Sequence, residues 1–121
     1  MEIRVGILTI SDRSSRGEKT DISGPTLMEA VQKQGWIVAA RCIVGDDPEQ
    51  IIFMLTQWSD KEKIDLILTT GGTGFAPRDV TPEATIAVIQ KLTPGLCEVM
   101  RRESLKITPH AMLSRAVAGI R

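Results

Sequence analysis

The residues with the clearest potential for chemistry are the glycines and threonines of Thr69–Gly74, which are followed by Arg78 and Asp79. The apolar run Leu66–Leu68 before them predicts a buried strand, and Thr81-Pro82 after them predicts the start of a helix. A glycine-rich turn between a strand and a helix is a frequent anion site, because its backbone N–H groups can converge on a phosphate. Arg78 adds a cation that pairs with phosphate, and Asp79 adds a carboxylate that can bind a metal or transfer a proton. We therefore predict a phosphate-binding loop.

This loop differs from both common nucleotide-binding motifs. Phe75-Ala76 follows Gly74, where a Walker A loop requires lysine and then serine or threonine. Pro77 stands where a dinucleotide fingerprint carries its third glycine. The alternative interpretation is a tight strand-to-helix connection in which the glycines only supply positive φ angles.

Three carboxylates follow the three predicted strands, and ligands of an open parallel sheet bind beyond the C-terminal ends of its strands. Asp12, Asp46 and Asp79 are therefore expected at one edge of the sheet. Asp47 precedes Pro48 and lies three residues before Gln50, which predicts a helix cap and leaves Asp46 free. Thr81 is predicted to cap the next helix, which leaves Asp79 free apart from a possible turn hydrogen bond. Asp46 and Asp79 beside a phosphate loop suit Mg²⁺, so we predict that both bind the metal and act in catalysis.

Strands alternate with helices along the chain, which predicts an α/β fold: a three-layer, doubly wound parallel sheet covered by helices on both faces. The predicted strands are Ile3–Ile10, Trp36–Val44 and Ile64–Leu68. The first predicted helix runs from Pro25 to a stop at Gly35, and the second opens at Asp47 and carries the apolar stripe Ile51, Ile52, Leu55 and Trp58. The third begins at Pro82 and carries Ile86, Ile89 and Leu92. A fourth follows Thr93-Pro94-Gly95. The polar stretch Ser11–Gly24 is predicted to be a loop.

The composition is that of a globular protein: 121 residues with 42% hydrophobic and 25% charged residues, which we interpret as one domain over residues 1–121. Lys and Arg together equal Asp and Glu at 15 each, which argues against a nucleic-acid-binding protein. The N-terminus shows no leader pattern and no apolar run is long enough for a membrane span, so we expect a cytoplasmic protein without membrane association. Cys42 and Cys97 form no metal or redox motif and are expected as buried thiols, and His110 is expected to be exposed or capping. The other large side chains expected in the core are Trp36, Trp58, Met28, Met54, Met100 and Met112.

Five segments occur together in an order that resembles the MogA/MoaB-type molybdopterin-binding family, which includes molybdopterin adenylyltransferases and the N-terminal domain of gephyrin. They are Ile10–Arg13, Val44–Asp47, Thr69–Gly74, Pro77–Ala84 and Met112–Arg115. The combination of TTGGTG with PRDVTPEA is far more specific than a lone glycine motif. The similarity extends from about residue 3 to the end of the chain.

The resemblance implies adenylyl transfer from ATP to molybdopterin, with Mg²⁺ required and pyrophosphate released before molybdate insertion. By this resemblance Asp46 and Asp79 support metal binding and catalysis, while the glycine loop cradles phosphate. The substrate-binding residues that we predict are Ser11, Asp12, Thr70, Gly71, Gly72, Thr73, Gly74, Arg78 and Ser114. The family further implies a homotrimer and a partner protein for molybdate insertion.

Family members continue beyond the position of Arg121, so we expect this chain to lack the C-terminal strand and helix of the domain. Two other functions fit the same residues. A non-catalytic module of the MoaB type would bind molybdopterin, or serve as a scaffold, without transferring AMP. A small α/β nucleotide-binding protein unrelated to pterin would bind ATP independently of molybdopterin.

Overall fold

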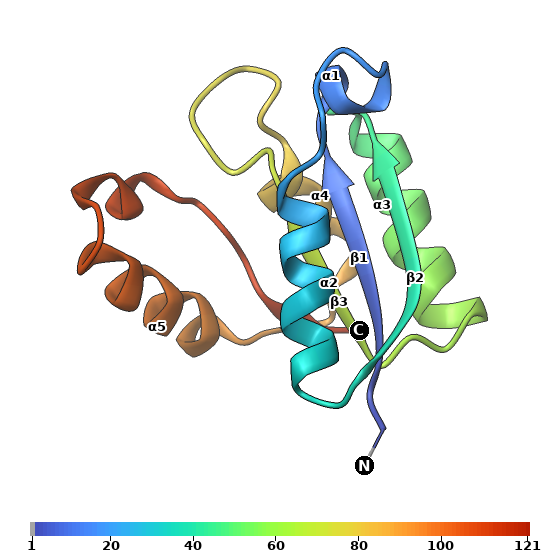
Figure 1. Ribbon diagram of the computed structural model, residues 1–121. Coiled ribbons are helices and arrows are strands. Elements are labelled where there is room, and N and C mark those ends of the chain that lie inside the picture. The colour runs from blue at the N-terminus through green and yellow to red at the C-terminus, as the bar shows by residue number, and fades with distance from the viewer. Residues whose placement is uncertain (1) are drawn as a thin grey trace.

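The computed structural model describes residues 2–121, and it is an α/β protein (Figure 1). Its elements in chain order are β1 (Arg4–Ile10), α1 (Asp12–Ser15), α2 (Ser23–Lys33), β2 (Ile37–Val44), α3 (Pro48–Thr56), η1 (Gln57–Lys61), β3 (Leu66–Thr70), α4 (Thr81–Val88), β4 (Lys91–Leu92), α5 (Pro94–Leu105), η2 (Pro109–Leu113) and β5 (Gly119–Ile120). The element η1 is a π-helical turn and η2 is a 3₁₀ turn.

A parallel sheet in the order β2-β1-β3 forms the centre of the molecule. The strand β1 lies in the middle, where Leu8 pairs with Cys42 of β2 and with Thr69 of β3. Six of its seven residues are buried, as expected for a strand covered on both faces. The predicted parallel sheet is confirmed.

Helices cover both faces of this sheet, so the predicted three layers are present (Figure 1). Because side chains alternate along a strand, Leu8 and Ile10 face one layer while Val5 and Ile7 face the other. The first layer contains α3, η1 and α4, and its largest buried side chain is Trp58, at 4% exposure. On the opposite face, Val31 of α2 packs on the sheet together with the half-buried Met28 and Trp36.

Several predicted helix boundaries are wrong. The stretch predicted as a loop contains α1, and α2 begins at Ser23 rather than Pro25. The predicted stripe on the helix after Pro82 does not exist, because α4 ends at Val88 and Ile89 has the extended angles φ −79° and ψ 152°. Leu92 then lies in β4, which pairs antiparallel with β5.

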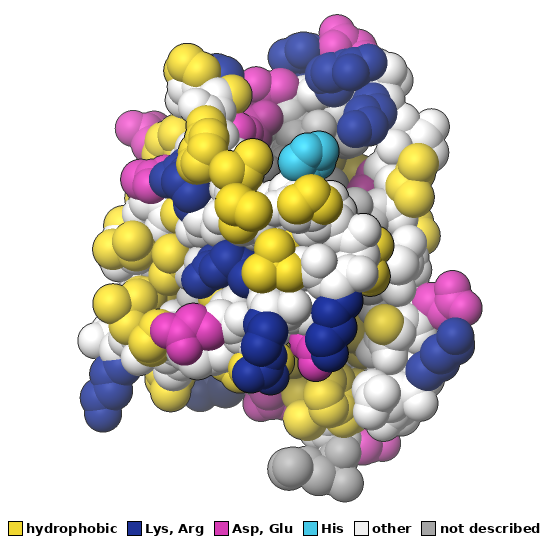
Figure 2. Space-filling view, turned by 90° about the vertical axis from the view of Figure 1, so that its left-hand side faces the viewer, with side chains coloured by type: hydrophobic (Ala, Val, Ile, Leu, Met, Phe, Trp, Pro, Cys, Tyr) yellow, Lys and Arg dark blue, Asp and Glu magenta, His cyan; other side chains and the backbone are white. Residues whose placement is uncertain are grey.

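The helix α5 lies beside the sheet rather than on it (Figure 1). It exposes apolar side chains, among them Met100 at 60%, and Met112 of the following turn is exposed at 64%. The predicted core positions of both methionines are therefore wrong, because no element of the described chain covers this face. Figure 2 shows a face of the molecule on which hydrophobic and basic side chains lie near the single histidine.

The remaining expectations from composition are mixed. Cys97 is a buried thiol as predicted, but Cys42 is only half-buried. His110 is exposed. Within residues 2–121, every helix is too short or too polar to cross a membrane.

Candidate functional site

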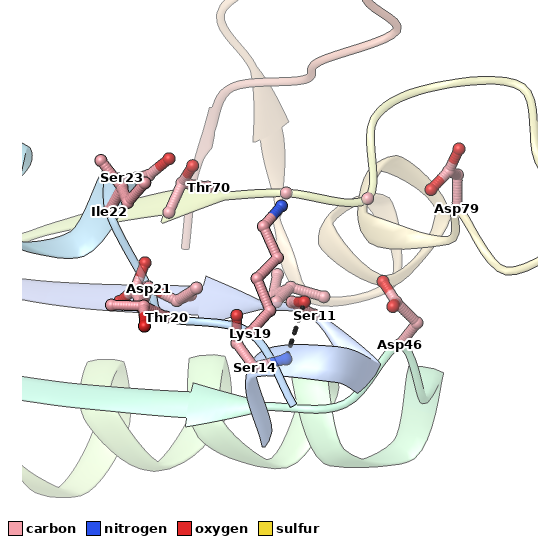
Figure 3. A pocket seen from close by; sticks show the side chains of 14 residues that line it. Ser11, Ser14, Lys19, Thr20, Asp21, Ile22, Ser23, Asp46, Thr70 and Asp79 are labelled. Carbon is pink, nitrogen blue, oxygen red and sulfur yellow. Dashed lines mark hydrogen bonds between the residues drawn. The ribbon is translucent and has the colours of Figure 1, made fainter. Parts of the chain in front are cut away.

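A cavity of about 450 Å³ opens at the C-terminal ends of the three strands. Its walls come from the end of β1 with the turn after it, residues 19–23 up to the first residue of α2, Asp46 after β2, residues 70–72 at the end of β3, and Asp79. The volume lies within the range of small-molecule sites, which is roughly 300–1,000 Å³. Figure 3 shows the Asp46 and Asp79 carboxylates near one end of this cavity and Asp21 near the other.

The glycine turn at the end of β3 passes very close to the backbone of β1. Gly71 and Gly72 have φ angles of 101° and 68°, and a Cβ atom on Gly71 would overlap the carbonyl oxygen of Ile10. Only glycine accommodates both the angles and the contact. Any ligand at this turn therefore meets bare backbone rather than side chains, as a phosphate cradle requires.

Thr81 fixes this turn instead of capping α4 with its side chain. Its hydroxyl donates to the Gly71 carbonyl at 2.8 Å and its N–H donates to the Gly72 carbonyl at 3.1 Å. The N-cap residue of α4 is Val80, so the predicted cap is wrong. The predicted cap by Asp47 is confirmed, since its side chain accepts a hydrogen bond from the Glu49 N–H at the start of α3, whereas Gln50 accepts from the Gly45 N–H.

Asp12 and Asp46 hold each other at the edge of the sheet. The Asp12 N–H donates to Asp46 Oδ2 at 2.9 Å, and the Asp46 N–H donates to Asp12 Oδ1 at 2.8 Å. The first N–H groups of a helix have no intrahelical partner, and Asp12 is the first residue of α1. The Asp46 carboxylate accepts the hydrogen bond from the Asp12 N–H and so supplies the missing partner. Asp46 is therefore not free as predicted, because one of its oxygens has a structural task.

Arg78 points to Asp12 rather than into the cavity. Its guanidinium donates to both carboxylate oxygens of Asp12, at 2.9 and 3.0 Å, and its side chain is 66% exposed. The hydrogen bond from the Asp46 N–H, and then those from Arg78, lower the pKa of Asp12 below its ordinary value. In this structure Arg78 is paired with Asp12, and its binding of phosphate stays a prediction.

Asp79 lies on the other side of the glycine turn from Asp46. Its Oδ2 accepts a hydrogen bond from the Ala76 N–H at 3.0 Å, which is the turn hydrogen bond that the sequence predicts. A Cβ on Gly74 would lie 2.8 Å from Asp79 Oδ2, and one on Gly72 would lie 3.3 Å from Asp46 Oδ1. The two carboxylates thus flank the turn at close range.

The donor set of this cavity fits Mg²⁺ only in part. Among residues 2–121, no three carboxylate, histidine or cysteine side chains converge as a metal cluster. Asp46 and Asp79 each give one oxygen to a backbone N–H and retain the other oxygen as a possible ligand. Mg²⁺ is commonly bound by one or two carboxylates with waters and substrate phosphates. These residues therefore suit an ion that arrives together with a phosphate ligand.

The other predicted binding residues divide into two groups. Ser11, Thr70, Gly71 and Gly72 line the cavity, and the Ser11 hydroxyl also accepts from the Ser14 N–H as the cap of α1. Thr73, Gly74 and Ser114 lie outside this cavity.

Arg115, the residue after Ser114, joins the C-terminal segment to the glycine loop. Its N–H donates to the Thr73 carbonyl at 3.0 Å, and its guanidinium donates to the carbonyls of Gly74 and Asp79, both at 2.8 Å. A further hydrogen bond of 2.7 Å reaches the carboxylate of Glu83 on α4. Arg115 thereby fixes the backbone on both sides of the segment that carries Asp79.

Asp21, which the sequence did not single out, is a buried carboxylate whose side chain is 5% exposed. It accepts hydrogen bonds from the Gly24 N–H at 3.0 Å, from the Thr9 hydroxyl at 2.9 Å and from Arg41 at 3.2 Å. Burial raises the pKa of Asp21, but these three hydrogen bonds together lower it below its ordinary value. A signal was present, since an aspartate three residues before Gly24 is typical of a helix start.

Comparisons with known proteins identify the family of this chain. Residues 6–120 match the model of the family described as probable molybdopterin binding domain. The chain belongs to this family. MoaB from Thermus thermophilus, described as a molybdopterin biosynthesis enzyme, superposes with a TM-score of 0.92 at 50% identity, over 98% of this chain and 75% of that one.

Two curated relatives of the same molybdopterin-binding family show how much of a longer protein this chain matches. It is 45% identical to a molybdopterin adenylyltransferase of Helicobacter pylori (strain J99) over 98% of its own length and 69% of that protein. It is 47% identical to gephyrin of Dictyostelium discoideum over 97% of its own length, and it spans only 18% of that relative. The family membership predicted from the sequence motifs is confirmed.

Proposed function

We propose that the chain acts in molybdenum cofactor biosynthesis by transferring the adenylyl group of ATP to the phosphate of molybdopterin. The observation that carries this proposal is the pair of carboxylates, Asp46 and Asp79, on either side of a bare-backbone turn at the mouth of the cavity. The similarity to the Helicobacter pylori molybdopterin adenylyltransferase supports it.

In this reaction an oxygen of the molybdopterin phosphate attacks the α-phosphorus of ATP. A new P–O bond forms, the bond between the α-phosphorus and the bridging oxygen breaks, and pyrophosphate leaves with that oxygen. The second pKa of a phosphate monoester is about 6, so the attacking group is ionised at neutral pH. No general base is needed, which agrees with a cavity whose described lining contains neither histidine nor cysteine.

The contribution of the chain is mainly to hold the two phosphates in line. The backbone of Gly71 and Gly72 offers N–H groups to one phosphate, and the Thr81 hydroxyl keeps that turn in place. Mg²⁺ bound by Asp46, Asp79 and the substrate phosphates would neutralise the charge that builds up during the transfer. The requirements for ATP and Mg²⁺, the homotrimer, the molybdate-insertion partner and the cytoplasmic location remain predictions.

Product formation by an Asp79→Asn variant tests this proposal. The chain is incubated with molybdopterin, ATP and Mg²⁺, and adenylylated molybdopterin is measured by chromatography. Asparagine still accepts the hydrogen bond from Ala76, so the turn should persist while the charge is lost. We expect turnover to fall by roughly 100-fold or more, because electrostatic stabilisation of the transition state is removed, with molybdopterin binding retained.

Asp65→Asn is the matched control. Asp65 lies at the N-terminal ends of β1 and β3, away from the cavity, and likewise accepts one backbone hydrogen bond, from the Arg4 N–H at 2.9 Å. This variant should turn over like the wild type. Near-normal turnover in Asp79→Asn would refute the proposed role of Asp79. A folded wild-type chain that binds molybdopterin and forms no product would instead support the non-catalytic module.

A further inference from the structure

The cavity is acidic and contains a single basic side chain in the described part of its wall. Asp21, Asp46 and Asp79 line it, whereas Lys19 is the only lysine or arginine that does. Arg41 forms an ion pair with Asp21, so the negative charge of Asp21 is balanced by that of the guanidinium. Two carboxylates therefore remain beside one cation at a site that is proposed to receive polyanionic substrates.

Lys19 is available for a ligand, whereas Arg78 is occupied. Arg78 donates to both oxygens of Asp12 and does not line the cavity. Across residues 2–121, Lys19 takes part in none of the seven ion pairs and none of the side-chain hydrogen bonds. Figure 3 shows its side chain extending from the segment before α2 across the cavity, towards the end of β3 that carries Thr70.

The base of this lysine is positioned by the protein core. Asp21, two residues further along the chain, is fixed to Thr9 on β1, to Arg41 on β2 and to the start of α2. A Cβ on Gly24 would overlap the Asp21 carboxylate, so the segment approaches α2 closely. The wall that carries Lys19 is thus anchored, while the long side chain keeps its freedom to follow a ligand.

We propose that Lys19 binds a phosphate group of a substrate, as the cation that faces the glycine turn across the cavity. The ammonium group would donate charge-assisted hydrogen bonds to a phosphate whose other oxygens face the backbone of Gly71 and Gly72. The proposal rests on the proposed function for the two molecules that bring a phosphate, ATP and molybdopterin. Lys19 also offsets the repulsion that Asp46 and Asp79 exert on such an anion.

Equilibrium binding of each ligand separately tests this role. The affinities of Mg²⁺-ATP and of molybdopterin are measured for the wild type, Lys19→Gln, Lys19→Arg and Lys33→Gln. Lys33 is the matched control because it is exposed on α2 and pairs only with Glu29, at 3.4 Å. Lys19 has no partner to lose, so the melting temperature of Lys19→Gln should equal that of the wild type.

We expect Lys19→Gln to weaken the binding of one ligand by roughly 10- to 100-fold, the range for a hydrogen bond to a charged group. Lys19→Arg should retain most of the affinity, and Lys33→Gln should bind like the wild type. The weakened ligand identifies the source of the phosphate, nucleotide or pterin. Wild-type affinity of Lys19→Gln for both ligands, or an equal loss in Lys33→Gln, would overturn the proposal.

Turnover decides the proposed function independently of this inference. Product formation that is unchanged in Lys19→Gln, together with unchanged binding, would leave the transferase standing and remove the role of Lys19. If the chain shows no turnover but its ligand binding depends on Lys19, the proposed phosphate site is supported and the proposed transferase activity is refuted.

Discussion

Replacing Gly71 by alanine should lower the free energy of unfolding for two reasons, which we call the two demands of this position: its positive φ angle and its close contact with β1. The first demand is the φ angle of 101°, which costs an L-residue about 1–2 kcal/mol. The second is the contact with the Ile10 carbonyl, where a Cβ has no room and the backbone of β1 or β3 must shift. Overpacking of this kind adds about 1–3 kcal/mol.

Gly35→Ala is the reference because Gly35 shares the first demand and lacks the second. Its φ angle is 77°, and a Cβ there would meet nothing within 4 Å. The stability difference between the two variants therefore isolates the contact with Ile10, at about 1–3 kcal/mol. For a chain of this size that corresponds to a melting-temperature difference of roughly 4–12 °C.

Urea unfolding followed by tryptophan fluorescence measures this difference, with the buried Trp58 as reporter. The slope of the free energy against urea should be the same in both variants, so that the midpoints compare stability alone. Gly71→Ala should also lose ligand binding, because the shifted backbone is the wall of the cavity. Equal midpoints for Gly71→Ala and Gly35→Ala would refute the argument from the Ile10 contact.

Two further predictions concern the residues that hold the walls of the cavity. Arg115→Met removes the hydrogen bonds to the Gly74 and Asp79 carbonyls, so limited proteolysis within residues 73–80 should become faster. Arg102→Met is the control, because Arg102 is exposed. Equal cleavage in the two variants would contradict the role of Arg115. Asp21 has a pKa below its ordinary value of 3.8, so it stabilises the folded state above that pH and loses this effect as the pH falls through the lowered pKa. The melting-temperature gap between the wild type and Asp21→Asn should accordingly be constant near neutral pH and close in acid, and a gap that is independent of pH would contradict this.

The three strands of the parallel sheet were predictable from local pattern, with an error at β3, whereas the two-residue strands β4 and β5 were not predicted. The start of β3 lies two residues later than predicted, because Ile64 packs into the core before the strand begins. Its end includes Thr69 and Thr70, which pair with Leu8 and Thr9 of β1. Threonine favours strands, but the neighbouring glycines predict that both threonines belong to the loop.

The site was predictable to the level of which segments meet, and not to the level of which side chains pair. Three aspartates after three strands could be placed at one edge from topology alone. The ion pair of Arg78 with Asp12 joins residues 66 positions apart, and the hydrogen bonds between Asp12 and Asp46 span 34 positions. Such pairs depend on distances that only the folded chain defines, so the sequence alone predicts Asp46 and Arg78 as unpaired, whereas both form hydrogen bonds in the structure.

The central position of β1 has a consequence for how the chain folds during its synthesis. Of the three strands in this sheet, β1 is synthesised before both of its neighbours. At about 5–20 residues per second, the last residue of β3 follows that of β1 by roughly 3–12 s. Throughout that interval a nearly continuous apolar strand has at least one unpaired edge, which invites capture by a chaperone or by another nascent chain. The strand that organises the finished site is therefore also the segment that most needs protection before the site exists.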